Sequence, residues 1–198
     1  MLSFIENIGL ILQRYGAVFA QGLWNTLWLS FVSVFLGTFL GILVALGKLS
    51  RHKLLNGVVS TYIEIIRGTP ILLQLYFFWL ALPNILPSIS DTTCILSALV
   101  VNASAYIAEI IRAGIQAVDA GQREASLSLG MTERAIMTKV IFPQAIKNIL
   151  PALGNEVIVM IKQTSLASVF FFGELMTAYK QVQSTTFLAL EPLTISGL

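Results

Sequence analysis

Long apolar stretches alternate with short polar ones along most of the chain. Five stretches are apolar, the last of them short: residues 18–46, 58–82, 92–118, 150–172 and 192–198. A helix that rises about 1.5 Å per residue needs roughly 20 residues to cross the hydrocarbon core of a bilayer. The pattern therefore predicts an all-α polytopic bundle over residues 1–198, with about five membrane spans of which the last is incomplete in this chain.

Two of these blocks contain glycine or proline at informative positions. In the first block, Gly37 and Gly41 form a GxxxG pattern, which either lets another helix approach closely or arises by chance in a glycine-rich membrane helix. The second block is interrupted at residues 67–70, where Pro70 removes an amide donor. We expect a kinked helix at Pro70.

Composition excludes several classes of protein. The chain is 56% hydrophobic and 11% charged, whereas a soluble domain carries about 25% charged residues. The net charge of +2 is small and the basic residues are spread over several loops, so no nucleic-acid partner is expected. A single Cys94 and a single His52 cannot form an intrachain disulfide or a usual zinc site.

The distribution of basic residues predicts the orientation in the membrane. Residues 48–56 contain three Lys or Arg and residues 119–148 contain four, whereas residues 82–91 contain none. Because Lys and Arg accumulate in cytoplasmic loops, both basic loops are expected inside and the N-terminus outside. Residues 1–16 lack the pattern of a signal peptide and are expected to belong to the mature protein. The prediction is a multi-pass protein of a cytoplasmic membrane.

Residues 119–148 carry too many charges for hydrocarbon and are expected to form a cytoplasmic loop with two short helices. Asp119 can cap the first helix, with Glu124 in its first turn, and Gly130 can end it in the left-handed conformation. Thr132 can cap the second helix, and Pro143 is expected to stop it. Each helix has a narrow apolar face that is expected to contact a partner protein. The faces consist of Ala125 and Leu129 on the first helix, and of Ile136, Met137 and Val140 on the second.

These residues are ordered as in a known family. Residues 124–126 read Glu, Ala, Ser and are followed by Gly130, Ile141, Pro143 and Gln144, which resembles the EAA loop of permeases of ATP-binding-cassette importers. Further matches are IRGTP at 66–70, AYIAEIIRAGI at 105–115, GQREA at 121–125 and KQTSL at 162–166. Together they resemble the branch that takes up polar amino acids such as His, Glu, Gln or Arg.

The resemblance implies a type I importer permease that works with a second permease protomer, a cytoplasmic ATPase and an extracytoplasmic solute-binding protein. ATP and Mg are expected on the ATPase, and this chain is expected to bind no cofactor and to catalyse no reaction. The family also has a complete fifth span and a basic tail, whereas this chain stops at Leu198. The residues implied in coupling to the ATPase are Gln122, Glu124, Ala125, Ser126, Gly130, Ile141 and Pro143. The alternative for this loop is a helix lying on lipid headgroups.

Polar residues within the spans are candidates for a substrate path. Asn102, Tyr106 and Glu109 follow one another at spacings of four and three, so they share one helical face that should point into the bundle or toward a water-filled path. Glu109 either pairs with Arg112 as a structural bridge, which we favour, or meets the amine of a substrate. The other candidates are Arg67, more readily explained as a helix anchor, and the neutral Gln74 and Ser165. The role of Lys162 stays open.

Two other functions are weighed against import. An ion-coupled secondary transporter or channel subunit predicts inverted repeats, and none is visible. An intramembrane enzyme needs a catalytic set near the middle of the bilayer, whereas the candidate acids are expected near the ends of the spans. ATP-driven import of a polar amino acid is the function that the sequence favours.

Overall fold

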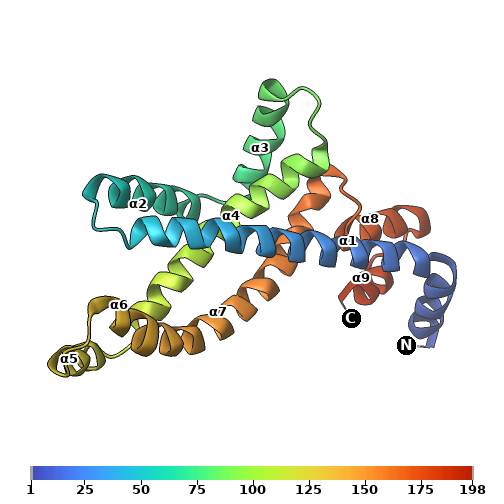
Figure 1. Ribbon diagram of the computed structural model, residues 1–198. Coiled ribbons are helices and arrows are strands. Elements are labelled where there is room, and N and C mark those ends of the chain that lie inside the picture. Colours follow the sequence, from blue (N-terminus) through green and yellow to red (C-terminus); the bar gives the residue numbers. More distant parts are fainter. Residues whose placement is uncertain (1, 198) are drawn as a thin grey trace.

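The computed structural model describes residues 2–197, and every regular element in that range is helical (Figure 1). A π-helical turn at Met137–Ile141 and a 3₁₀ turn at Thr164–Phe170 flank the seventh α-helix. The α-helices are α1 Leu2–Lys48, α2 Lys53–Gly68, α3 Ile71–Ile85, α4 Asp91–Gln116, α5 Ala120–Ser128, α6 Glu133–Ile136, α7 Phe142–Gln163, α8 Leu175–Thr186 and α9 Leu190–Gly197.

Three helices form the centre of the molecule. The long α1 crosses α4, and α7 packs against both of them (Figure 1). The buried apolar cluster at this crossing draws its side chains from α1, α3, α4, α7 and the 3₁₀ turn: Leu29, Val34, Leu75, Ile95, Ala98, Leu99, Ala103, Ile107, Met160 and Ala167. The helices α8 and α9 pack together against the N-terminal half of α1, where they form a second cluster. The core therefore lies where chain segments far apart in sequence meet.

Glycines set the distance between α1 and α4. A Cβ atom on Gly37 would lie 2.6 Å from Cβ of Ala103, and one on Gly41 would lie 2.9 Å from Cγ2 of Ile107. Real Cβ atoms do not approach other atoms so closely, so only glycine fits at both positions. The close helix approach that the GxxxG pattern predicts is confirmed. A third glycine, Gly114 of α4, is in similarly tight contact with Ile149 of α7.

The second apolar block is broken, not kinked. The helices α2 and α3 meet at 107°, so the expectation of one kinked helix is wrong. Thr69 has an extended backbone, with ψ 145°, as the residue before a proline prefers, and Pro70 sits immediately before α3. The side chain of Gln74 crosses the corner, where its Nε2 donates to the carbonyl oxygen of Ile66 at 2.7 Å and to Oγ1 of Thr69 at 2.8 Å.

The third block forms α4 close to its expected limits. Ser90 caps the helix, because its Oγ accepts a hydrogen bond from the backbone N–H of Thr93 at 3.2 Å. Asp91 lies in the first turn, where a negative charge is favoured.

Pro143 does not end the helix that Thr132 begins, so that expectation is wrong. The chain passes from α6 through the π-helical turn directly into α7, and Pro143 lies in the first turn of α7. The amide of Phe142 donates to the carbonyl oxygen of Met137, five residues earlier. A proline in a first turn removes no donor that an α-helix requires, and the wider π turn supplies the change of register. The fourth helical block consequently starts at Phe142, eight residues before the apolar run begins.

Within residues 2–197, α1 and α4 are long and apolar enough to cross a membrane. Two bent pairs also qualify if each is one broken span: α2 with α3, and Glu133–Phe170 with Leu175–Thr186 at 49°. These four units correspond to the four long apolar blocks of the sequence. The last apolar residues form α9, which is eight residues long and lies against α1 and α8.

The glycine contact leads to a prediction about stability. Gly37→Leu is expected to lower the melting temperature of the detergent-purified protein, because overpacking a tight contact costs about 1–3 kcal/mol. Gly16→Leu in the same helix is the matched control, since a Cβ there meets nothing within 4 Å. Equal melting of the two variants would show that the crossing of α1 and α4 tolerates side chains and does not depend on glycine.

Candidate functional site

The helix α5 projects from the bundle together with α6, at one corner of the molecule (Figure 1). Asp119 caps α5, because its Oδ1 accepts from the N–H of Gly121 at 2.6 Å. At the other end, Gly130 has a φ of +76°, its N–H donates to Leu127 O, and the N–H of Met131 donates to Ser126 O. This pair of bonds around a left-handed glycine is a Schellman motif. The predicted roles of Asp119 and Gly130 at the helix ends are confirmed.

The second short helix is tied to the first. Thr132 caps α6, with its Oγ1 accepting from the N–H of Ala135 at 3.4 Å, as the sequence predicts. The guanidinium of Arg123 in α5 pairs with both carboxylate oxygens of Glu133 in α6, although both side chains are about half exposed. Ile136 of α6 is fully buried. The two helices therefore form one small unit that continues through the π-helical turn into α7.

The predicted coupling residues fall into two groups. Gln122, Glu124 and Ala125 are exposed on α5, whereas Ser126 is buried and its Oγ donates to Gln122 O at 2.7 Å. Glu124 lies in the second turn of α5, so its expected place in the first turn is wrong. The reason is that the helix begins at Ala120, directly after its cap.

Ile141 and Pro143 lie in the π-helical turn and in the first turn of α7, away from the exposed surface of α5. Ile141 is buried and Pro143 is exposed. Around α5 and α6, Leu129 has 82% of its surface exposed, and Leu127 and Met137 are exposed to a little over 40%. An ordered helix that presents apolar side chains to the outside is suited to contact another protein.

The polar face of α4 is buried at Asn102 and only partly buried farther along the helix. Asn102 is only 2% exposed, and its Nδ2 donates to Oε1 of Gln74 at 2.9 Å. Tyr106 and Glu109 follow on the same face and are partly buried. Asn102 therefore points into the protein, where it is joined to Gln74 of α3, whereas Tyr106 and Glu109 are only partly covered.

Glu109 is held by two cations. Its Oε2 accepts from Nε of Arg112 at 2.9 Å, and its Oε1 contacts both Nη2 of Arg112 and, at 3.9 Å, Nη1 of Arg67. The guanidinium of Arg67 also lies 5.3 Å from the ring centre of Tyr106. The structural pair that the sequence favours for Glu109 is therefore formed, and Arg67 links α2 to α4.

These charges line a cleft between α2, α4 and the C-terminal end of α1. Its volume is about 360 Å³, and Lys48 of α1 contributes an amine that donates to Oγ of Ser60. The cleft combines cationic and anionic groups, so an occupant with both charges would find partners in it. Its lining includes Lys48, Asn56, Ser60, Glu64, Arg67, Glu109, Arg112 and Gln116.

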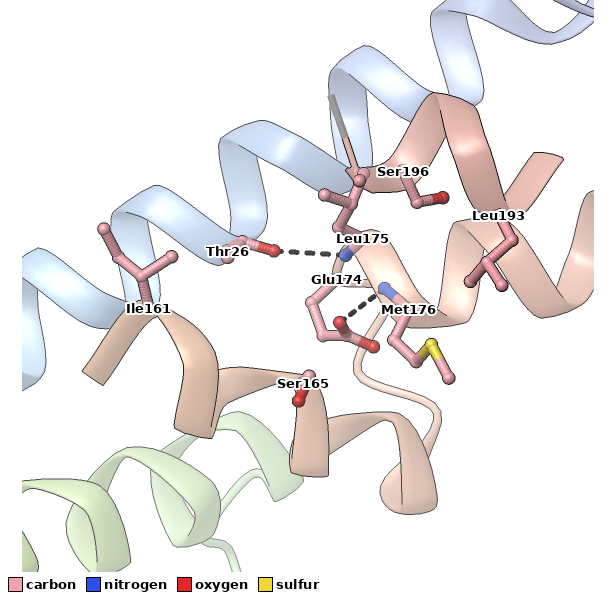
Figure 2. A pocket seen from close by; sticks show the side chains of 9 residues that line it. Thr26, Ile161, Ser165, Glu174, Leu175, Met176, Leu193 and Ser196 are labelled. Carbon is pink, nitrogen blue, oxygen red and sulfur yellow. Dashed lines mark hydrogen bonds between the residues drawn. The ribbon is translucent and has the colours of Figure 1, made fainter. Parts of the chain in front are cut away.

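Ser165 lies elsewhere. It belongs to the 3₁₀ turn after α7 and lines a separate pocket of about 230 Å³ that Thr26 and Glu174 also border (Figure 2). The carboxylate of Glu174 accepts from the N–H groups of Met176 at 2.6 Å and Thr177 at 2.8 Å, so it caps α8. Thr26 accepts from the N–H of Leu175 (Figure 2). The structure thus brings Gln74 to Asn102, and Arg67 to Tyr106 and Glu109, but places Ser165 at a different pocket.

One acidic residue was missed by sequence reasoning. Glu156 lies in the interior of α7, is 5% exposed, and its Oε1 has no hydrogen-bond partner. The expectation that acids occur only near the ends of the spans is wrong for this residue. The signal was present, because Glu156 follows buried Ile149 by seven residues and so shares its helical face. Across residues 2–197, no three His, Cys, Asp or Glu side chains are grouped to hold a metal ion.

The chain is similar in sequence to known membrane transport proteins. A family described as binding-protein-dependent transport system inner membrane component matches residues 37–197. The arginine transport system permease protein ArtQ of Bacillus subtilis (strain 168) is 39% identical over 90% of this chain and 82% of its own length. The nopaline transport system permease protein NocM of Agrobacterium fabrum (strain C58 / ATCC 33970) is 34% identical over 96% of this chain and 83% of its own length.

Solved structures are similar as well. A chain of an amino acid ABC transporter crystallised with histidines superposes with a TM-score of 0.90 at 49% identity, over 95% of this chain and 88% of that one. A chain of the MetNI methionine ABC transporter in an inward-facing conformation shares the fold, with a TM-score of 0.73 at 23% identity, over 90% of this chain and 86% of that one.

The ion pair of Glu109 generates a prediction. Glu109→Ala is expected to lower stability by about 1–2 kcal/mol, because it leaves the guanidinium of Arg112 partly buried without its carboxylate. The double variant Glu109→Ala/Arg112→Ala should lose less than the sum of the two single variants, as measured by thermal melting in detergent.

The exposed pair of Arg123 and Glu133 is the matched control, and Glu133→Ala should cost less than about 1 kcal/mol. Strictly additive losses at Glu109 and Arg112 would show that the two side chains do not stabilise each other.

Proposed function

Because this chain belongs to the family of inner-membrane components of binding-protein-dependent transport systems, we propose that it is the permease subunit of an ATP-driven importer of polar amino acids. The match over residues 37–197 carries this proposal. The names of the relatives, which include permeases for arginine, nopaline and L-cystine, support an amino acid as the substrate. The similarity favours this function over an ion-coupled transporter or channel.

In this proposal, α5 is the docking helix for a cytoplasmic ATPase that binds ATP and Mg. Support comes from its exposed Gln122, Glu124 and Ala125, and from the uncovered Leu129 at its C-terminal end. The Schellman motif at Gly130 fixes the path of the chain after α5. The Arg123–Glu133 pair joins α5 to α6, and since α6 continues into α7, a movement of α5 could be passed to the core along one continuous helix. The buried Ser126 and Ile141 would support this unit from within, and the exposed Pro143 would lie beside it in the first turn of α7.

The substrate path is proposed to run along the polar face of α4. Gln74 and Asn102 are joined by a hydrogen bond at the corner between α2 and α3, and such neutral amides are suited to exchange partners with a passing amino acid. Arg67, Tyr106 and Glu109 line the charged end of this face, with Glu109 serving first as a structural bridge to Arg112. Ser165 would contact substrate only near the pocket beside α8.

The remaining partners follow from the class of transporter. A second permease protomer, identical or different, would complete the path, and an extracytoplasmic binding protein would deliver the substrate. The protein is proposed to be a multi-pass protein of a bacterial cytoplasmic membrane. Its basic loops, residues 48–56 and 119–148, would face the cytoplasm.

Coupling is tested at Glu124 and Gly130. Glu124→Lys and Gly130→Val are expected to insert in the membrane but to lose at least tenfold in substrate-stimulated ATP hydrolysis by the reconstituted complex. The physical reasons are charge reversal on the docking surface and a β-branched residue at a φ of +76°.

Matched controls are available on the same chain. Glu6→Lys reverses an exposed charge on α1, and Gly154→Val replaces a helical glycine with nothing within 4 Å of its Cβ position. Both controls should retain hydrolysis and co-purification of the ATPase. Wild-type hydrolysis in Glu124→Lys and Gly130→Val would refute docking at α5.

Orientation is tested with single cysteines. In a Cys94→Ala background, Ser88→Cys and Ser128→Cys place thiols at exposed positions of the two loops that are expected on opposite sides. A membrane-impermeant thiol reagent on intact cells should label Ser88→Cys alone, and both should react after the membrane is opened. Labelling of only Ser128→Cys on intact cells would invert the proposed topology.

A further inference from the structure

A lysine at the end of α1 has no acidic partner within residues 2–197. Lys48 takes part in none of the three ion pairs that the described residues form, and its amine donates to Oγ of Ser60 on α2. It lines the charged cleft of about 360 Å³ together with Arg67 and Arg112, which both contact Glu109. The α1 end of this cleft therefore keeps a positive charge that no ion pair of the described residues compensates.

Positive charges predominate around this lysine. The cleft lining contains three Lys or Arg and two Glu, of which Glu109 is already paired and Glu64 is exposed on α2 and forms none of the three ion pairs. The chain that leads from α1 into α2 adds Arg51 and Lys53, and residues 48–56 contain no acid. This excess of positive charge favours an anionic occupant.

Contacts with α2 hold Lys48 in position. Oγ of Ser60, which accepts from the lysine amine, also donates to the carbonyl oxygen of Asn56 at 2.6 Å. The side-chain amide of Asn56 donates in turn to the backbone carbonyl oxygen of Lys48. An ammonium group has three N–H donors, so two remain for a ligand when Ser60 takes one. Lys48 is therefore a positioned donor and not a freely moving surface charge.

An apolar stripe on α1 runs up to the cleft. Its members follow one another at helical spacings of four, three, four and three, and all of them are exposed: Phe35, Phe39, Ile42, Leu46 and Leu49. The rings of Phe35 and Phe39 are in edge-to-face contact, with centroids 5.0 Å apart. Leu49 also lines the cleft. The stripe lies away from Gly37 and Gly41, which face α4, and the helices of residues 2–197 leave it uncovered.

The length and the side chains of the stripe fit a lipid chain. From Phe35 to Leu46 the helix rises about 16 Å, and one leaflet of hydrocarbon is about 15 Å thick. Helix interfaces in membranes are rich in small residues, whereas every member of the stripe is a large apolar residue. An acyl chain therefore suits the stripe better than a second helix. The charged cleft lies at the end of the stripe, where the headgroup of that lipid would be.

We propose that the cleft binds the phosphate of an anionic phospholipid, with Lys48 as its ligand and one acyl chain along the stripe. Basic pockets between membrane helices on the cytoplasmic side are suited to anionic headgroups. In the proposed orientation the cleft lies beside the basic residues 48–56, on the cytoplasmic side. The inference goes beyond the proposed import function, because it depends on this membrane orientation and not on the substrate.

The wild-type complex provides the first test. Phosphatidylglycerol and phosphatidylethanolamine with identical acyl chains are titrated separately into the delipidated permease–ATPase complex in detergent, and bound lipid is counted by native mass spectrometry. Phosphatidylglycerol is expected to bind about fivefold more tightly, which corresponds to about 1 kcal/mol for one basic residue at an anionic headgroup. Equal binding of the two lipids overturns the proposal.

Soluble glycerol 3-phosphate tests whether the occupant is a lipid. It offers a phosphate without acyl chains, so it should displace bound phosphatidylglycerol only at concentrations about tenfold higher than those at which the lipid itself competes. Displacement at equal concentrations would show that the cleft is a site for a soluble anion, and the lipid assignment would be wrong.

Substitution tests the role of Lys48. Lys48→Gln removes the charge and should weaken phosphatidylglycerol binding about fivefold, while phosphatidylethanolamine binding changes by less than about twofold. Lys48→Arg keeps the charge and should retain most of the phosphatidylglycerol binding. Lys53→Gln is the matched control, since it removes an exposed charge from the same basic stretch but outside the cleft, and it should bind as the wild type does. Equal losses in Lys48→Gln and Lys53→Gln would show that the stretch attracts lipid by its overall charge, which overturns a site at Lys48.

The stripe is tested at Phe39. Phe39→Ala should weaken the binding of both lipids by the same factor, because it removes apolar surface and no charge. Phe77→Ala, at an exposed ring of α3 outside the stripe, is the control. Unchanged binding in Phe39→Ala overturns the role of the stripe, and dissociation of two permease protomers in that variant would assign the stripe to a protein contact.

The outcomes separate this inference from the proposed function. If Lys48→Gln does not accumulate in the membrane, the comparison of the two lipids on the wild type and on Lys48→Arg decides. If a complex that imports an amino acid binds both lipids equally, the lipid site fails and the proposed function stands. If the complex binds phosphatidylglycerol selectively but imports no amino acid, the lipid site stands and the proposed function fails.

Discussion

The absence of side chains at Gly37 and Gly41 is the constraint on which the rest of this structure depends. Helices inside a bilayer gain little from hiding apolar surface from one another, because lipid is as apolar as they are. Close packing must therefore hold α1 against α4, and only glycine permits the approach that Ala103 and Ile107 require. The central cluster forms around that crossing, and α7 joins it through another glycine, Gly114.

The sequence was informative wherever structure follows from a few neighbouring residues. Asp119, Gly130 and Thr132 act at helix ends because capping depends on one side chain or one φ angle. The polar face of α4 could be predicted since it follows from helical spacing and the cost of exposing polar groups to lipid. Coupling between α5 and a partner remains a prediction that rests on family resemblance and exposure.

The features that the sequence did not predict depend on contacts between residues that are not adjacent in the chain. Pro143 was expected to end a helix because proline lacks the amide donor that a helix interior requires. The π-helical turn instead places Pro143 in the first turn of α7, where an α-helix needs no amide donor. The corner at Pro70 is a sharp break because Gln74 replaces the missing backbone bonds with its own amide. Glu156 was overlooked because the block around it was assumed to start at residue 150, which placed it near an end.

The continuity of α6 with α7 has a mechanical consequence. From Glu133 through the π-helical turn to Gln163 the chain is helical without a break, and the close contact of Ile149 with Gly114 of α4 lies near its middle, 16 residues from one end and 14 from the other. A rod that pivots at that contact has arms of nearly equal length, because helix length is proportional to residue number. A tilt applied from α5 would therefore swing the far arm, which carries Glu156, in the opposite direction and over a similar distance.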